Sequence, residues 1–235
     1  VPLVVRTHPS MRLADRQRDL RSAIARRARM TGRSRAALLV EHFAWRAVQQ
    51  ASLRGAVVPE FTPVDGQRRM QALATDDPSV VAALADVRAD LVVVFGGSPI
   101  PRASLAAIAV PMLNVHASDP SFCRGMPPFF WEIHAGRDSA TLTLHEIVAR
   151  LDAGAVIAQR TMPVLWGRSL VDTLRATRER MVVEAPLLLA DGLAKVVSGE
   201  ARPHVVTPGP LRTLPTLGEI VTAHRGCVRR WRARR

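Results

Sequence analysis

The sequence is poor in the residues that cross-link a chain or anchor it in a membrane. It has only two cysteines, Cys123 and Cys227, and their spacing fits neither a disulfide framework nor a zinc site, so we expect no metal. Proline or charge breaks every apolar stretch before the roughly 18 residues that a membrane-spanning helix needs. The first residues also lack the pattern of a secretory signal. We therefore expect a cytoplasmic protein that does not contact a membrane.

Acidic residues are scarce beside arginine, and Lys195 is the only lysine. The formal net charge of +13 sits mostly in two segments. Residues 6–35 hold ten arginines against two aspartates, and residues 225–235 hold six arginines and no acid. Such segments are either the solvated face of a helix or a surface for a polyanion such as tRNA. Because tyrosine is absent and aromatic residues make up 4% of the chain, platforms for base stacking are poorly supported, and we expect no nucleic-acid partner.

Apolar periodicity divides the chain into alternating helices and strands. We expect helices over 11–30, 34–52, 78–87 and 102–107, strands over 91–95, 112–116, 141–145 and 156–162, and a long helix that begins at Ser169. After Pro203 the chain looks extended and loosely held. We expect two regions, a catalytic domain over 1–165 and a C-terminal helix with a basic tail over 166–235.

The strand, helix and strand between residues 91 and 116 predict a βαβ unit. This unit predicts an α/β fold of the Rossmann-like kind, an open and mostly parallel sheet with flanking helices. Ligands of such sheets bind beyond the carboxyl ends of the strands. Gly96 and Gly97 follow the first of these strands, while Asn114 and His116 end the second.

Asn114 and His116 are two residues apart on a strand, so both side chains project from the same face. An asparagine amide can donate a hydrogen bond to a developing oxyanion, and a histidine can hold a proton near neutral pH. An aspartate can orient and stabilise that histidine. These are the groups that acyl transfer to an amine requires, although an Asn-x-His pair is a weak motif by itself.

An ordered set of motifs makes the segment from Asp90 to Val164 resemble the folate-dependent formyltransferase family. That family includes glycinamide ribonucleotide, methionyl-tRNA and sugar N-formyltransferases. The motifs are Asn114-Val115-His116-Ala117-Ser118, Arg124-Gly125, Phe130-Trp131, Thr143-Leu144-His145, Leu151-Asp152-Ala153-Gly154 and Ile157-Ala158-Gln159. Their order and spacing are far more specific than any single motif.

The resemblance implies roles for particular residues. Asn114 would stabilise the oxyanion on the formyl carbon, His116 would act as acid/base or electrostatic partner, and Asp152 would orient His116 and help to remove the proton from the attacking amine. The backbone that would line the pocket of the donor, 10-formyltetrahydrofolate, comprises Gly96, Gly97, Ser98, Ile100, Ala153 and Gly154. Ser118 and Arg124 match loop positions that would shape the site. For His145 we favour a structural hydrogen-bonding role.

The sequence also departs from the family pattern. Where the family commonly has Ser-Leu-Leu-Pro, this chain has Ser118-Asp119-Pro120-Ser121, which we expect to place an extra carboxylate beside the site. The resemblance begins near what would be the second strand of the family domain. We therefore expect the first strand-helix unit to be missing.

The acceptor is the least specified substrate. Phe130-Trp131 after Arg124-Gly125, together with the arginine-rich segment before residue 50, looks most like bacterial sugar-type members. We therefore expect a small acceptor, an amino sugar or sugar nucleotide. The alternatives are a hydrolase of formyltetrahydrofolate and a non-catalytic polyanion-binding protein on the same fold. The oligomeric state stays open, with a homodimer as one option.

Overall fold

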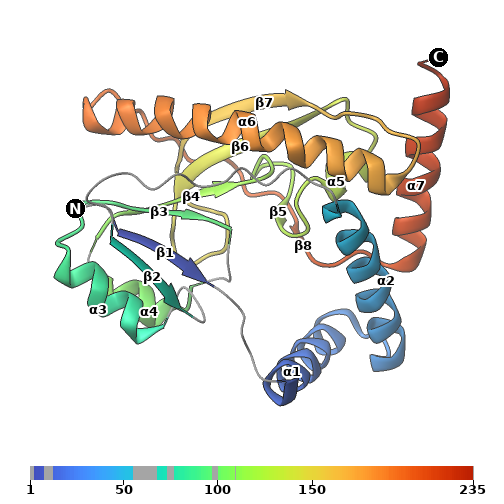
Figure 1. Cartoon of the computed structure of the whole chain (residues 1–235), viewed down its shortest axis with the longest axis horizontal. Helices are drawn as coiled ribbons and strands as arrows, with labels where there is room; N and C mark the ends of the chain where they lie inside the picture. The colour runs from blue at the N-terminus through green and yellow to red at the C-terminus, as the bar shows by residue number, and fades with distance from the viewer. Residues whose placement is uncertain are drawn as a thin grey trace.

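The computed structural model describes residues 3–7, 13–54, 68–72, 77–96, 100–108 and 110–234. Its central element is a four-stranded sheet in the order β3-β4-β6-β7 (Figure 1). β3 (Val92–Phe95) and β4 (Met112–His116) run parallel and are connected through α4 (Arg102–Ala107), which confirms the predicted βαβ unit. The parallel register brings the carboxyl ends of both strands to one edge, so Gly96 comes near the end of β4.

The other half of the sheet is antiparallel. β6 (Ser139–Glu146) pairs with β4, and β7 (Val156–Pro163) pairs with β6. Among the described strands three of the five pairings are parallel, and the predicted mostly parallel α/β fold with flanking helices is confirmed. The antiparallel register sets Asn114 opposite His145 and therefore decides which residues meet at the site.

The core lies between this sheet and α6 (Leu170–Val197), which runs along β6 and β7 (Figure 1). The helix begins as predicted at Ser169, whose hydroxyl accepts a hydrogen bond from the Asp172 N–H at 3.1 Å. Four leucines in this core are at most 1% exposed, and the burial of each contributes about 1.5–3 kcal/mol to stability. They are Leu142 and Leu144 of β6 and Leu174 and Leu188 of α6.

Two helices before the sheet confirm the sequence expectation. α1 (Leu13–Thr31) and α2 (Arg35–Leu53) are separated at Gly32, and Trp45 of α2 is buried in the main core. β1 (Leu3–Thr7) and β2 (Arg68–Ala72) form a separate parallel pair. α3 (Pro78–Asp86) precedes β3. None of the described helices is long and apolar enough to cross a membrane.

The expectation of an extended, loosely held tail after Pro203 is wrong. β8 (Leu211–Arg212) pairs in parallel with β5 (Arg124–Gly125), and α7 (Leu217–Arg232) packs against α5 (Phe130–His134). A capping box between Thr216 and Glu219 starts α7. The buried stripe is only Ile220, Ala223 and Cys227. So narrow an apolar stripe among arginines gives little signal in the sequence.

Candidate active site

Asn114 and His145 form the first pair of polar side chains at the sheet edge. Asn114 Nδ2 lies 3.2 Å from His145 Nε2. His145 Nδ1 lies 2.8 Å from the carbonyl oxygen of Glu146, which only accepts, so Nδ1 carries a proton. Burial lowers the pKa of His145 against the opposing effects of the Glu146 carbonyl and Asp152, so the ring is neutral near pH 7. Its Nε2 therefore accepts from the Asn114 amide, whose second N–H is left to donate to a ligand.

His116 is held between a backbone carbonyl and a carboxylate. Its Nε2 lies 3.2 Å from the carbonyl oxygen of Cys123, and its Nδ1 lies 3.7 Å from Asp152 Oδ2. Because the carbonyl only accepts, Nε2 donates and Nδ1 is the nitrogen that faces the carboxylate. His116 and Asp152 are 8% and 9% exposed. A proton taken up at Nδ1 would complete a largely buried ion pair, in which each charge stabilises the other.

A strained turn aims Asp152 at both histidines. Asp152 has φ +46°, in the left-handed region that aspartate tolerates better than most residues. Its Oδ2 accepts the Gly125 N–H at 2.8 Å, and its Oδ1 lies 3.7 Å from His145 Nε2. The carboxylate is thus fixed by a backbone donor from β5, a segment 27 residues earlier in the chain.

The three residues predicted as catalytic therefore meet at one end of the sheet. Asn114 is the only asparagine in the chain, so its place beside two histidines and an aspartate does not reflect a general abundance of asparagine. The rings of His116 and His145 are 6.1 Å apart and nearly perpendicular. Within the part of the chain that the structure describes, no three His, Cys, Asp or Glu side chains form a group that could hold a metal ion. The arrangement offers one amide donor and one proton-holding pair.

A family model described as formyl transferase matches residues 12–185. The chain belongs to the formyl transferase family. The matched range contains β4, β6 and the Asp152 turn, the three segments that carry the polar residues described above. It ends inside α6.

Methionyl-tRNA formyltransferases are among the curated relatives of this chain. The one from Roseiflexus castenholzii is 33% identical over 158 residues, which cover 67% of this chain and 46% of that protein. The one from Enterococcus faecalis is 31% identical over 119 residues, which cover 50% of this chain and 37% of that protein. The chain thus matches less than half the length of these two relatives.

Solved structures share the fold. A variant of HypX from Aquifex aeolicus aligns with a TM-score of 0.52 and 22% identity, covering 67% of this chain and 30% of that one. A sugar N-formyltransferase from a Shewanella species aligns with a TM-score of 0.50 and 16% identity, covering 81% of this chain and 83% of that one. At these identities the likeness supports the fold only.

The residues predicted to line the folate pocket fall into three groups. Gly96 directly follows β3 and has φ +73°, a conformation that favours glycine, and Ile100 packs against the smaller core cluster. Gly97 and Ser98 lie outside the described residues. Ala153 and Gly154 follow Asp152, and a Cβ at Gly154 would overlap the carbonyl oxygen that binds His145. Contact of these residues with a folate stays a prediction.

Ser118 and Arg124 are buried and hold loops together rather than point into solvent. The Ser118 carbonyl accepts the Thr143 hydroxyl at 2.8 Å. Arg124 donates to the carbonyls of Leu151 at 3.0 Å and Gly209 at 2.8 Å, which ties the Asp152 turn to the C-terminal segment. Both residues thus hold neighbouring segments together, and their role in shaping the site stays a prediction.

The departure at Asp119 has a local explanation. Asp119 Oδ1 accepts from the Ser121 N–H at 2.8 Å and from the Ser121 hydroxyl at 2.7 Å. The carboxylate thus closes its own turn, as aspartate does in loops. One oxygen of the predicted extra carboxylate is already satisfied within the loop.

Sequence reasoning missed Glu132. Glu132 lies on α5, is 2% exposed and accepts a hydrogen bond from the hydroxyl of Ser118. Ser118 follows His116 by two residues in the chain. Burial raises the pKa of Glu132, against the opposing effects of Ser118, His116 and Arg137. The available signal was its position inside the apolar run Phe130–Ile133, where an exposed carboxylate is unexpected.

Proposed function

We propose that this chain transfers a formyl group from 10-formyltetrahydrofolate to a primary amine. The observation that carries the proposal is the meeting of an amide donor with an imidazole–carboxylate pair at the carboxyl end of β4. Membership of the formyl transferase family supports the same chemistry. Because the chain spans less than half of its first curated relatives, its activity and substrates are proposed here for this chain alone.

Asn114 acts on the formyl oxygen. As the amine nitrogen bonds to the formyl carbon, negative charge develops on that oxygen, and the unused Asn114 N–H donates to it. His145 holds the amide in this orientation through the hydrogen bond to Nδ2. A preorganised donor of this kind commonly contributes about a hundredfold or more in rate.

His116 and Asp152 move the proton. The attacking amine becomes positively charged and gives a proton to the Asp152–His116 pair, with Nδ1 of His116 facing the carboxylate. The bond between the formyl carbon and the donor nitrogen then breaks, and the Asp152–His116 pair returns the proton to that nitrogen as it leaves. The products are a formamide and tetrahydrofolate, and no metal is required for this step.

For the acceptor we propose an amino sugar or sugar nucleotide. A chain with a net charge of +13 suits an anionic substrate. Phe130 and Trp131, part of the sugar-type resemblance, are buried, so they support the site rather than stack against the acceptor itself. A tRNA-linked amine is the second candidate, and the observation that favours it is the likeness to methionyl-tRNA formyltransferases.

The test has two stages. Calorimetric titration with a stable 10-formyltetrahydrofolate analogue should show saturable binding. Formyl transfer is then screened by mass spectrometry with amino-sugar nucleotides, with methionyl-tRNA and without any amine. Release of formate without an amine would indicate the hydrolase, and polyanion binding without folate affinity would indicate the non-catalytic alternative.

Variants separate the site from the fold. Asn114→Ala and His116→Ala should each lower the rate of transfer by about a hundredfold or more while the protein stays folded. His204→Ala is the matched control, because His204 is an exposed histidine whose strand-like bridge to Val156 uses only the backbone. Equal activity of His116→Ala and His204→Ala would contradict the proposed mechanism.

A further inference from the structure

Residues 204–212, named here the C-terminal strap, run beside the site although they lie beyond the range that the family model matches. At its start His204 bridges Val156, two residues after Gly154. Further along, the Gly209 N–H donates to the carbonyl oxygen of Pro120 at 2.8 Å. The strap therefore covers the loop between β4 and β5 and ends at β8.

The end of the strap brings the backbone of Arg212 beside the segment that holds Asp152. Arg212 lies opposite Gly125 in the parallel register, and the Gly125 N–H is the donor to Asp152. The Met126 N–H donates to the Arg212 carbonyl at 3.3 Å. Arg212 is thus one strand spacing, about 4.8 Å, from the backbone that fixes Asp152.

The charge of Arg212 is uncompensated. Its guanidinium carbon lies 4.8 Å from the centroid of the Trp131 ring, and the residue is exposed. No carboxylate among the described residues forms an ion pair with it, whereas Arg230 and Arg234 both pair with Asp138. Stacking on Trp131 restricts the side chain and leaves the guanidinium N–H groups available to a ligand.

The charge of Arg212 also affects the buried thiol of Cys123. Burial, with a contribution from Glu132, raises the pKa of Cys123 to about 12, and Arg212 acts in the opposite direction. The carbonyl of Cys123 is the acceptor for His116. The charge of Arg212 therefore acts on the segment that carries the hydrogen-bond acceptor of His116.

Exposed apolar residues stand next to Gly125, Asp152 and Arg212 in the chain. Met126 follows Gly125, Leu151 precedes Asp152, and Leu211 precedes Arg212 in the chain. Their exposed fractions are 50% for Met126, 37% for Leu151 and 45% for Leu211. Apolar surface beside a few placed polar groups is typical of small-molecule sites. We name Met126, Leu151 and Leu211 the apolar rim.

We propose that Arg212 binds a phosphate group of the amine acceptor, with the apolar rim covering the rest of that substrate. This inference rests on the proposed function. A guanidinium matches two phosphate oxygens at once, which fixes both the position and the direction of the acceptor. Anchored there, the acceptor can bring its amine to Asp152 without any other charged contact.

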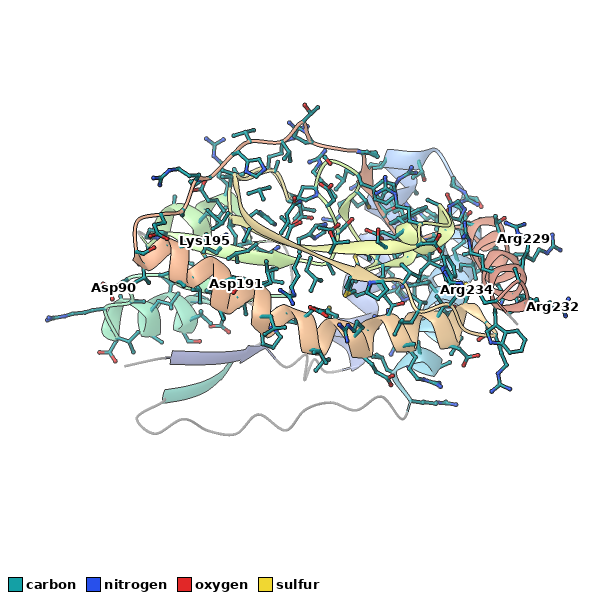
Figure 2. All side chains as sticks on the ribbon, turned by 90° about the horizontal axis from the view of Figure 1, so that it is seen from above. Asp90, Asp191, Lys195, Arg229, Arg232 and Arg234 are labelled. Carbon is teal, nitrogen blue, oxygen red and sulfur yellow. The ribbon has the colours of Figure 1, made fainter. Side chains whose placement is uncertain are left out.

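The test uses inorganic pyrophosphate as the probe. The full chain, saturated with the folate analogue, is titrated with pyrophosphate by calorimetry. Arg212→Gln should weaken pyrophosphate binding about tenfold or more, and Arg212→Lys should restore part of it, because lysine keeps the charge but loses the fork. Arg229→Gln is the matched control, since Arg229 is exposed on α7 and points away from the body of the molecule (Figure 2).

Other outcomes overturn the inference. Equal losses in Arg212→Gln and Arg229→Gln would show that only net charge matters. Unchanged binding in Arg212→Gln would place the anion elsewhere, and weaker binding of the folate analogue to Arg212→Gln would assign Arg212 to the carboxylate tail of the donor. If the analogue does not bind the wild-type chain, the proposed function fails by itself, and titration with pyrophosphate alone still decides whether Arg212 holds an anion.

Discussion

Stability as a function of pH gives a direct test of the buried carboxyl of Glu132. Burial raises its pKa above the ordinary value of 4.5. The folded protein therefore binds more protons than the unfolded chain between 4.5 and the raised pKa of the folded state. In that window the free energy of unfolding falls as the pH rises, by at most about 1.4 kcal/mol per pH unit, and it levels off above the folded pKa.

Glu132→Gln removes this titration while keeping the size of the side chain and a partner for Ser118. We expect the wild type to lose stability relative to the variant as the pH rises from 4.5, with the slope given above. Urea denaturation at intervals from about pH 4.5 to 8.5 measures the difference, and titrations common to both proteins, such as that of His145, cancel. Glu200→Gln, at an exposed position, should follow the wild type.

Parallel stability curves for the wild type and Glu132→Gln would refute the reasoning. The carboxyl would then titrate alike in the folded and unfolded states, and burial would not be the force that acts on it. A wild type that gains stability relative to the variant as the pH rises would reverse the sign, and would mean that the hydrogen bond from Ser118 and the neighbouring charges outweigh desolvation.

Three further changes test the site and its frame. Asp152→Asn keeps an acceptor for the backbone N–H and tolerates φ +46°, so stability should hold while kcat for formyl transfer falls about a hundredfold or more. His145→Leu leaves the Asn114 amide without its acceptor and should lower kcat at least about tenfold with little change in donor affinity. Because the pKa of His145 is lowered in the folded state, the unfolded chain binds more protons below pH 6.5, and the wild type loses stability as the pH falls. The His145→Leu variant should lose less stability over the same pH range. An equal loss in both proteins would contradict a neutral His145 in the folded state. Gly154→Ala should destabilise by about 1–3 kcal/mol because its Cβ meets a backbone carbonyl, whereas Gly226→Ala, inside α7 with nothing within 4 Å, should stabilise by about 0.5–1 kcal/mol; thermal unfolding of both decides.

Local sequence pattern was enough to predict β3, β4 and the polar residues of β4. The apolar runs ending at Phe95 and His116 became β3 and β4 because β-branched and apolar residues bounded by glycine or polar residues favour buried strands. Side chains two residues apart on a strand share a face, so the spacing of Asn114 and His116 places both side chains on the same face of β4. The family resemblance added Asp152, and the structure brings this residue to His116.

Contacts between distant segments decided the rest. His145 became the partner of Asn114 only through the antiparallel register of β4 and β6, which no local pattern specifies. Glu132 and the C-terminal strap reach the site through contacts that span 14 and about 85 residues of chain. Local sequence patterns thus specify the strands of the sheet and the polar residues at their ends. The tertiary structure decided which of them meet, because register and packing between distant segments, rather than local propensity, set the neighbours of each side chain.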